Sequence, residues 1–593
     1  MNIPSTVVGP VIRPVTRAAV GLRGATLAGV AFLFFVPFLI PLRRAPIPTL
    51  DGEMIAAALL ALCAVASGLV ARGGVRLSWP LPSFLLLLIL VASIHWIVGD
   101  LAYTYSVTTL FMAVTLLFLA YAVGRWLRQT ETSAVALRWI SIGLVAGALI
   151  SVVIEVMQLL DVRGLSPWLY FQMKRTFPLQ PVANIGQPNQ LAAYLALAIP
   201  AAVYLAGEGH RRARWLVLAV AVIAAGIAFS LSRMGVLMIV MLSAWVMLKR
   251  DGENRSRRGF AVAIWAGFVA GAFVGPYLVA EQGDGASAIG RFLSAAYSDR
   301  TVMWRDAVHV ALTHPWLGVG VGEYAAAQYW VTAAGPGTLS TPYPHNVLLH
   351  IGAEFGIPAA LALGTLLSWG FLAEARKRWT DPVVSTVLIM GVLLLLHGML
   401  DWSLWVLFVS IPATLLFALG EPDTRVHVTA DPKASLVPMG LAALLYLPLF
   451  FIDFDDISRL ASRLYAEQRE LKGGASLGSV LGISQVGTST YFKPHADRML
   501  LAVTPIKRPV DEEQLARTAR VLSRLADEQT IALHIGALAL ADRMEEALRH
   551  VERLRAFAVT QERYAVAEKQ ILRMVASEGE RAEPLRARLA ALR

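Results

Sequence analysis

Long apolar runs alternate with short polar segments along the first 454 residues of the chain. Each run has about 17 to 25 residues, the length at which an α-helix crosses roughly 30 Å of hydrocarbon. The pattern predicts an all-α, polytopic membrane domain over residues 1–454. Its thirteen predicted spans lie near residues 25–42, 53–71, 81–98, 105–124, 135–158, 188–206, 215–231, 234–248, 260–280, 356–373, 383–400, 403–419 and 436–453.

The pattern changes after residue 454. Apolar residues now recur at helical spacing between charged positions, in 516–525, 531–540, 544–554 and 564–574. Short successive helices of this kind loosely resemble tetratricopeptide hairpins. We predict a soluble helical domain over residues 455–593, which either caps the adjoining face of the membrane domain or docks a protein partner.

Composition and charge support a membrane protein and fix its orientation. Apolar residues make up 56% of the chain and charged residues 16%, whereas soluble proteins carry about 25% charge. The net charge of +11 comes from Lys and Arg at the ends of apolar runs, which orients a membrane protein and does not indicate nucleic-acid binding. With the N-terminus inside and an odd number of spans, the C-terminal domain lies outside, in the periplasm of a Gram-negative cell. Arg43 and Arg44 alone oppose this bias at the first outer loop.

Two long segments fall on the predicted outer side, residues 159–186 and 281–345. An amide-rich stretch ends the first of them and leads into a span at Pro188. Its amides either cap that helix or hydrogen-bond sugar hydroxyls and phosphate oxygens. The candidate binding residues in this stretch are Asn184, Gln187, Asn189 and Gln190.

Three arginines also face the outer side. Arg233 stands between two spans with almost no loop to carry it into water, so it either snorkels or binds an anion. Arg300 and Arg305 lie in the amphipathic run of the long outer segment. Two or three guanidinium groups on one face can clamp a diphosphate, because their planar forks match phosphate oxygens.

Histidines mark the outer ends of two further spans. His345, followed by Asn346, stands at the membrane edge. Neighbouring arginines would depress its pKa below about 6.5 and leave a neutral general base for a hydroxyl nucleophile. His397 and Asp401 are spaced i, i+4 and either close a helix end or support that base.

These motifs, in this order, resemble the O-antigen ligase and polymerase superfamily, and more narrowly the PglL-type bacterial protein O-oligosaccharyltransferases. The resemblance rests on Asn184–Gln190, Leu231–Arg233, Arg300–Trp304, Pro344–Asn346 and His397–Trp405, and covers roughly residues 180–420. The last segment departs from the family pattern, because Asp401-Trp402-Ser403 replaces Glu-Tyr-Pro. A role for that aromatic hydroxyl therefore does not carry over to Trp402.

The resemblance implies a GT-C-like scaffold and metal-independent transfer of a glycan, with inversion, from an undecaprenyl diphosphate carrier to an acceptor hydroxyl. It makes His345 the expected base, and Arg233 and Arg300 the expected diphosphate binders. No cofactor is expected. The acceptor is a protein serine or threonine, or alternatively the lipid A core as in O-antigen ligases.

Two competing interpretations remain open. Asp453–Asp456 carries an Asp-x-Asp spacing that hard cations favour, although an ordinary membrane exit has the same composition. A transporter of lipid-linked glycans would also need many spans with polar residues. Its sites would lie near the middle of the membrane, however, whereas these polar clusters lie at one face.

Overall fold

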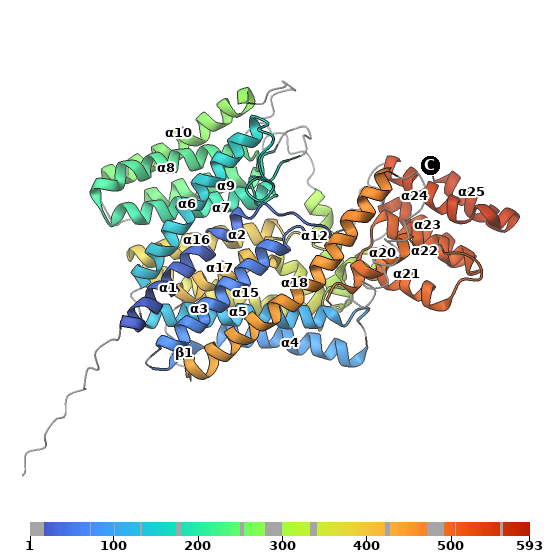
Figure 1. Cartoon of the computed structure of the whole chain (residues 1–593), viewed down its shortest axis with the longest axis horizontal. Helices are drawn as coiled ribbons and strands as arrows, with labels where there is room; N and C mark the ends of the chain where they lie inside the picture. Colours follow the sequence, from blue (N-terminus) through green and yellow to red (C-terminus); the bar gives the residue numbers. More distant parts are fainter. Residues whose placement is uncertain are drawn as a thin grey trace, which may run out of the picture.

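The computed structural model describes residues 17–592 with the exception of 72, 100, 131–132, 174–179, 249–253, 279–298, 332–340, 422–426, 471–490, 504–505 and 558–560. The described chain is all-α, as predicted, apart from one pair of short strands (Figure 1). Parts of the long outer segment, residues 281–298 and 332–340, lie outside the described residues.

Every predicted span coincides with an apolar helix of the described chain. Nine of these helices are long and apolar enough to cross a membrane, while α8, α9, α15 and α17 contain shorter apolar stretches. The protein is therefore a multi-pass membrane protein, and the number of thirteen spans stays a prediction. The helices of this body are α1 (Arg17–Leu33), α2 (Val36–Leu39), α3 (Leu50–Val70), α4 (Pro80–Val98), α5 (Tyr105–Thr130), α6 (Ser133–Leu159), α7 (Pro188–Gly207), α8 (His210–Phe229), α9 (Arg233–Leu248), α10 (Asn254–Leu278), α15 (Ile357–Arg378), α16 (Pro382–Leu400), α17 (Leu407–Gly420) and α18 (Pro432–Glu470).

Helix α7 lies at the centre of the membrane body, with 83% of its apolar stretch buried. Small residues let its neighbours approach closely, as is usual between membrane helices. A Cβ atom on Gly147 of α6 would lie 2.0 Å from the hydroxyl oxygen of Tyr194 in α7, and one on Gly235 of α9 would lie 3.5 Å from the Cβ atom of Ala192 in α7. Close packing of this kind fixes the position of α7, whose first turn carries the amides.

Shorter elements lie between the membrane body and the C-terminal helices (Figure 1). They are α12 (Asp299–Thr313), α13 (Tyr324–Val331), α14 (Val347–Phe355) and the 3₁₀ turn η1 (Ser403–Trp405). The C-terminal helices are α20 (Lys493–Val503), α21 (Glu512–Arg524), α22 (Glu528–Leu540), α23 (Met544–Phe557), α24 (Gln561–Met574), η2 (Ala576–Ala582) and α25 (Glu583–Ala591). The four helices predicted here are thus present within a few residues.

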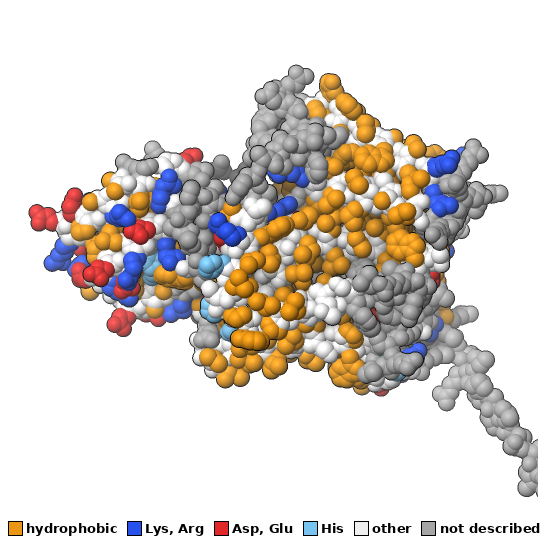
Figure 2. Space-filling view, turned by 180° about the vertical axis from the view of Figure 1, so that it is seen from behind, with side chains coloured by type: hydrophobic (Ala, Val, Ile, Leu, Met, Phe, Trp, Pro, Cys, Tyr) orange, Lys and Arg blue, Asp and Glu red, His pale blue; other side chains and the backbone are white. Residues whose placement is uncertain are grey.

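Helices α21 to α25 share a hydrophobic core that also includes Ala325 and Tyr329 of α13. Helix α18 continues through residue 454 to Glu470, so no break in the helix marks the predicted boundary. Figure 2 shows apolar side chains over the large body, and mixed acidic and basic side chains over the smaller C-terminal part. The division at residue 454 stays a prediction.

The strand pair was not predicted. β1 (Val75–Ser78) and β2 (His427–Ala430) run antiparallel with Val75 opposite Ala430. They join two loops at the end of the membrane body away from the C-terminal helices (Figure 1). Each strand has four residues. Pairing between loops about 350 residues apart leaves no local sequence signal.

Candidate active site

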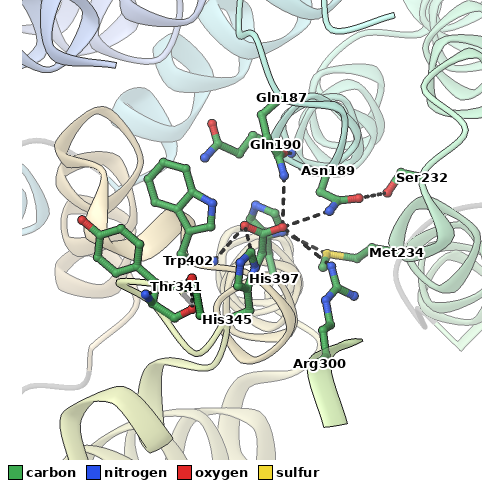
Figure 3. Close-up of polar contacts among 12 residues, drawn as sticks. Gln187, Asn189, Gln190, Ser232, Met234, Arg300, Thr341, His345, His397 and Trp402 are labelled. Carbon is green, nitrogen blue, oxygen red and sulfur yellow. Dashed lines mark hydrogen bonds and ion pairs between the residues drawn. The ribbon is translucent and has the colours of Figure 1, made fainter. Parts of the chain in front are cut away.

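A buried carboxylate forms the centre of the site. Asp401 follows the last residue of α16, and its side chain is 0% exposed. Burying such a charge requires hydrogen-bond donors. Gln187 Nε2 and Asn189 Nδ2 donate to Oδ2 at 3.2 and 2.9 Å, and the Trp402 N–H donates to Oδ1 at 2.8 Å (Figure 3).

The amides at the start of α7 both cap the helix and bind this carboxylate. Gln187 is the N-cap, and its side-chain oxygen accepts from the Gln190 N–H while its nitrogen faces Asp401. Ser232 Oγ donates to Asn189 Oδ1 at 2.8 Å, which turns the amide nitrogen of Asn189 toward Asp401. Gln187 therefore acts as a helix cap, as one interpretation predicts, and both amides bind a carboxylate of the protein. Binding of sugar hydroxyls or phosphate oxygens by these amides stays a prediction.

His345 stands on the other side of the carboxylate. Its Nδ1 lies 3.9 Å from Asp401 Oδ1, and its side chain is 24% exposed. Its φ of 55° is in the left-handed region, where non-glycine residues cluster at functional sites. Burial lowers the pKa of His345 and the charge of Arg300 lowers it further, while Asp401 acts in the opposite direction. The ring is therefore neutral at pH 7.

Arg300, in the first turn of α12, brings a cation to the same carboxylate. Its Nη2 lies 3.8 Å from Asp401 Oδ2, and its side chain is 29% exposed. Burial lowers the pKa of Arg300, and the charge of the nearby Arg233 adds to that effect. Arg233 is the exposed first residue of α9. The two guanidinium groups are thus close enough for one charge to act on the other. Their binding of a diphosphate stays a prediction.

His345, Arg300, Gln187, Asn189 and Asp401 together form what we call the Asp401 centre. Figure 3 shows Gln187, Asn189, Arg300 and His345 pointing toward one another from separate segments of the chain, and each of them contacts Asp401. The sequence predicted all five as candidates. From the sequence, Asp401 was expected only to support the base. The structure instead places Asp401 where the other four side chains meet.

Other predicted residues lie around this centre and outside it. Asn184 uses its amide on the backbone of Leu39, Leu169 and Phe171, at 2.8 to 3.0 Å, and so organises its own loop. Arg305 is exposed and contacts Asp306 at 3.2 Å. Asn346 caps α14 by accepting from the Leu349 N–H.

Gln190 and His397 lie deeper in the membrane body. Both are buried and line one cavity of about 20 Å³. His397 Nδ1 lies 2.9 Å from Met234 Sδ, and the side-chain amide of Gln190 has no hydrogen-bond partner among the described residues. Both polar side chains therefore line a water-sized space below the Asp401 centre.

Sequence reasoning missed two contributors to the site. Arg43 donates to the carbonyl oxygen of Asn184, and a Cβ on Gly186 would lie 2.6 Å from its Nε. Burial lowers the pKa of Arg43 to about 10. The sequence pointed to Arg43 only through its place in a predicted outer loop, where the positive-inside bias disfavours Lys and Arg. Ser232 had no signal beyond its place next to Arg233.

Tyr343 supplies an aromatic hydroxyl close to the position where the family pattern has one. Its ring stacks on Trp402 with centroids 5.3 Å apart and an interplanar angle of 10°. Burial raises the pKa of Tyr343 to about 12, so its hydroxyl keeps its proton. The side chain that replaces tyrosine at 402 is therefore packed against a tyrosine from another segment.

The aspartates after the last span contact cations of the protein. Asp455 pairs with Arg44 at 2.6 Å and with Arg459 at 2.6 Å. Arg44 also pairs with Asp51 at 2.5 Å, which explains why an arginine stands in this outer loop. Asp453 accepts from the Tyr491 N–H at 3.0 Å. In the described chain these contacts connect α18 to the start of α3 and to the C-terminal part.

Comparison with known proteins adds the family to this geometry. Residues 218–364 match the O-antigen ligase family, and residues 385–571 match the C-terminal part of a virulence factor membrane-bound polymerase family. Together with its apolar helices, these matches make the chain a multi-pass membrane protein of the O-antigen ligase and polymerase superfamily. Residues 181–206, the amide-rich stretch and the start of α7, match the protein glycosylation ligase family. Within the superfamily this stretch is similar to the PglL type.

A curated relative agrees with this placement. The general O-oligosaccharyltransferase of Acinetobacter baylyi is 23% identical over 360 residues, which cover 57% of this chain. The match spans 62% of the relative, less than two thirds of its length.

Proposed function

We propose that the protein transfers a glycan from an undecaprenyl diphosphate carrier to a serine or threonine hydroxyl of a protein, at the periplasmic face of the inner membrane. One observation carries this proposal. A neutral histidine, a buried carboxylate and two neighbouring guanidinium groups meet at one end of a bundle of apolar helices. The diphosphate of a membrane-anchored donor lies at that level, next to the water phase that holds the acceptor.

The arginines serve the donor. Arg300 and Arg233 bind the diphosphate and stabilise the negative charge that develops on it as the sugar leaves. Arg300 Nη2 is 3.8 Å from Asp401 Oδ2, so its charge lies beside that carboxylate at a distance beyond a direct hydrogen bond.

His345 and Asp401 serve the acceptor. The neutral ring takes the proton of the acceptor hydroxyl as its oxygen bonds to the anomeric carbon, and the bond from that carbon to the phosphate oxygen breaks. The diphosphate leaves with the bonding electron pair, and the single displacement inverts the configuration. The charge of Asp401, 3.9 Å from Nδ1, stabilises the imidazolium that forms.

The positive-inside bias supports a cytoplasmic N-terminus, which puts the Asp401 centre and the C-terminal helices on the periplasmic side. The protein glycosylation ligase match covers α7 and its amides, and favours a protein acceptor over the lipid A core.

The test is a reconstitution with defined donor and mixed acceptors. The purified chain in proteoliposomes receives a lipid-linked glycan, periplasmic proteins and lipopolysaccharide core, and mass spectrometry locates the sugar. Glycan on serine or threonine peptides supports the proposal. Glycan only on lipid A core would make the chain an O-antigen ligase, and movement of unaltered donor between leaflets without transfer would make it a transporter.

A further inference from the structure

Two adjoining cavities lie between helices beside the Asp401 centre. The apolar cavity has a volume of about 250 Å³ and is lined mainly by aliphatic side chains of α4, α5, α15, α16 and α17. The mixed pocket, of about 200 Å³, is lined by α3, α5, α14, α18 and Arg524 of α21. Both contain Leu110, Ala113, Trp405 and Leu407 in their walls, so they meet at this neck.

The apolar cavity fits a hydrocarbon chain. Its wall follows α17 from Leu407 to Gly420, which at the helical rise is about 20 Å, or two thirds of the hydrocarbon core. Water does not fill apolar cavities, and a peptide inside one would have backbone groups without hydrogen-bond partners. A lipid chain meets neither obstacle.

The mixed pocket has unpaired polar atoms for a ligand to satisfy. Ser106 Oγ and His350 Nδ1 have no hydrogen-bond partner among the described residues, and both residues line the pocket. Their exposed fractions are only 4% and 2%. Buried polar groups are nearly always paired, so these two indicate a polar ligand group between them.

The charges of the mixed pocket define that polar group. Arg524 donates Nε to the Tyr105 hydroxyl at 2.9 Å and Nη1 to the Gly322 carbonyl, which leaves its Nη2 protons for an anion. Glu53 and Glu354 line the same pocket, and each also has a partner in the protein: Glu53 accepts from Thr49 Oγ1 at 2.6 Å, and Glu354 lies 3.1 Å from His350 Nε2. One cation and two carboxylates match a head group that carries both a phosphate and an ammonium. The same set of charges does not suit a diphosphate, because the two carboxylates would repel its two adjacent phosphates.

We propose that the two cavities hold one acyl chain and the head group of a zwitterionic aminophospholipid. This lipid is distinct from the glycan donor, whose diphosphate belongs beside Arg300 and Arg233. Through Arg524 it contacts the C-terminal helices, and through Trp405 it reaches the turn that follows Asp401. It would thus join the membrane body to α21 next to the Asp401 centre.

The first experiment blocks the neck. The full-length chain and its Ala113→Trp variant are equilibrated with nanodiscs of equal phosphatidylethanolamine and phosphatidylglycerol, extracted in mild detergent and weighed by native mass spectrometry. Wild type should retain about one phosphatidylethanolamine, and Ala113→Trp should retain at least fivefold less. Leu86→Trp, on a 61% exposed position of α4 outside the cavity, should retain it as wild type does.

The second experiment tests the head group. Glu53→Gln keeps the shape of the side chain and removes a charge, so the retained lipid should shift at least threefold from phosphatidylethanolamine toward phosphatidylglycerol. The exposed Glu545→Gln should leave the ratio unchanged. Equal retention by wild type and Ala113→Trp would overturn the proposal, as would phosphatidylglycerol or a lipid diphosphate as the retained species. These readouts count bound lipid, so they do not depend on transferase activity.

Discussion

The Asp401 centre and the contact between α13 and α23 are both polar clusters built from distant segments, but they pair their polar groups differently. At the Asp401 centre the two basic side chains stay 3.8 and 3.9 Å from the carboxylate. Between α13 and α23, the Tyr329 hydroxyl and His550 Nδ1 share a hydrogen bond of 2.6 Å, and Arg553 donates to the Tyr329 carbonyl oxygen. In the first cluster His345 Nδ1 keeps its hydrogen-bonding capacity for a substrate, whereas in the second the Tyr329 hydroxyl and His550 Nδ1 use theirs on each other.

The histidines of the two clusters show what this difference means. Burial lowers the pKa of both rings, to about 3 for His550, so both are neutral at pH 7. His345 Nδ1 nevertheless has no hydrogen-bond partner among the described residues, whereas His550 Nδ1 is hydrogen-bonded to the Tyr329 hydroxyl. A lowered pKa does not by itself identify a general base. An unoccupied ring nitrogen beside a carboxylate is the more specific sign.

The largest effect is expected from His345→Ala. Loss of a general base costs about 10²- to 10⁴-fold in rate. Single-turnover transfer from saturating lipid-linked donor measures it, and His309→Ala, an exposed histidine of α12, is the matched control. Turnover within about fivefold of wild type would remove His345 from the chemistry.

Arg300→Ala should come next, with a loss of about 10²- to 10³-fold, typical of removing one donor that stabilises the developing charge. Arg305→Ala, which breaks a contact to Asp306, should cost less than about tenfold. Comparing the two variants distinguishes Arg300, which faces Asp401, from Arg305, which the sequence analysis grouped with it as a candidate. Equal losses in both would contradict that separation.

The pH profile of Arg300→Ala adds a second readout. The charge of Arg300 lowers the pKa of His345. The rate falls as the pH drops through that pKa, because the protonated ring is no base. Removing the arginine should therefore move the acid limb to higher pH, and an unmoved limb would show that the base is another group.

Asp401→Asn should reduce the rate by about 10²-fold, because the imidazolium of His345 loses its counter-charge. Asp401 raises the pKa of His345, so this variant should move the acid limb to lower pH, opposite to Arg300→Ala. A structural role for Asp401 would lower the folded fraction without moving the limb. The pH–rate profile, measured together with thermal stability, distinguishes the two.

The membrane helices and most residues of the Asp401 centre were predictable from the sequence, for physical reasons. Apolar length specifies membrane helices directly, so each predicted span coincides with an apolar helix. The candidates Gln187, Asn189, Arg300 and His345 were found because polar side chains at membrane ends are costly and therefore uncommon.

What the sequence lacked was the partner of each side chain. Asn184 and Asn189 have the same chemistry five residues apart, yet one contacts backbone and the other Asp401. That choice depends on the left-handed backbone of Ala183 and on Ser232, which comes from another helix end. The pairing of Tyr329 with His550 joins residues 221 positions apart and is equally invisible in the sequence.

The smallest effect on the rate is expected from Tyr329→Phe, which tests the closely paired cluster. The substitution leaves His550 Nδ1 buried without its hydrogen-bond partner, at a cost of about 1–3 kcal/mol. Amide hydrogen exchange in α22 to α24 should therefore accelerate by about tenfold or more, since 1.4 kcal/mol corresponds to a factor of ten. Tyr277→Phe, the same change at an 81% exposed position of α10, should leave exchange unchanged.

Transfer by Tyr329→Phe should stay within about threefold of wild type. A loss of transfer comparable to that of Arg300→Ala, with exchange unaltered, would mean that the contact between α13 and α23 takes part in the reaction, and close pairing would no longer distinguish structure from chemistry in this protein.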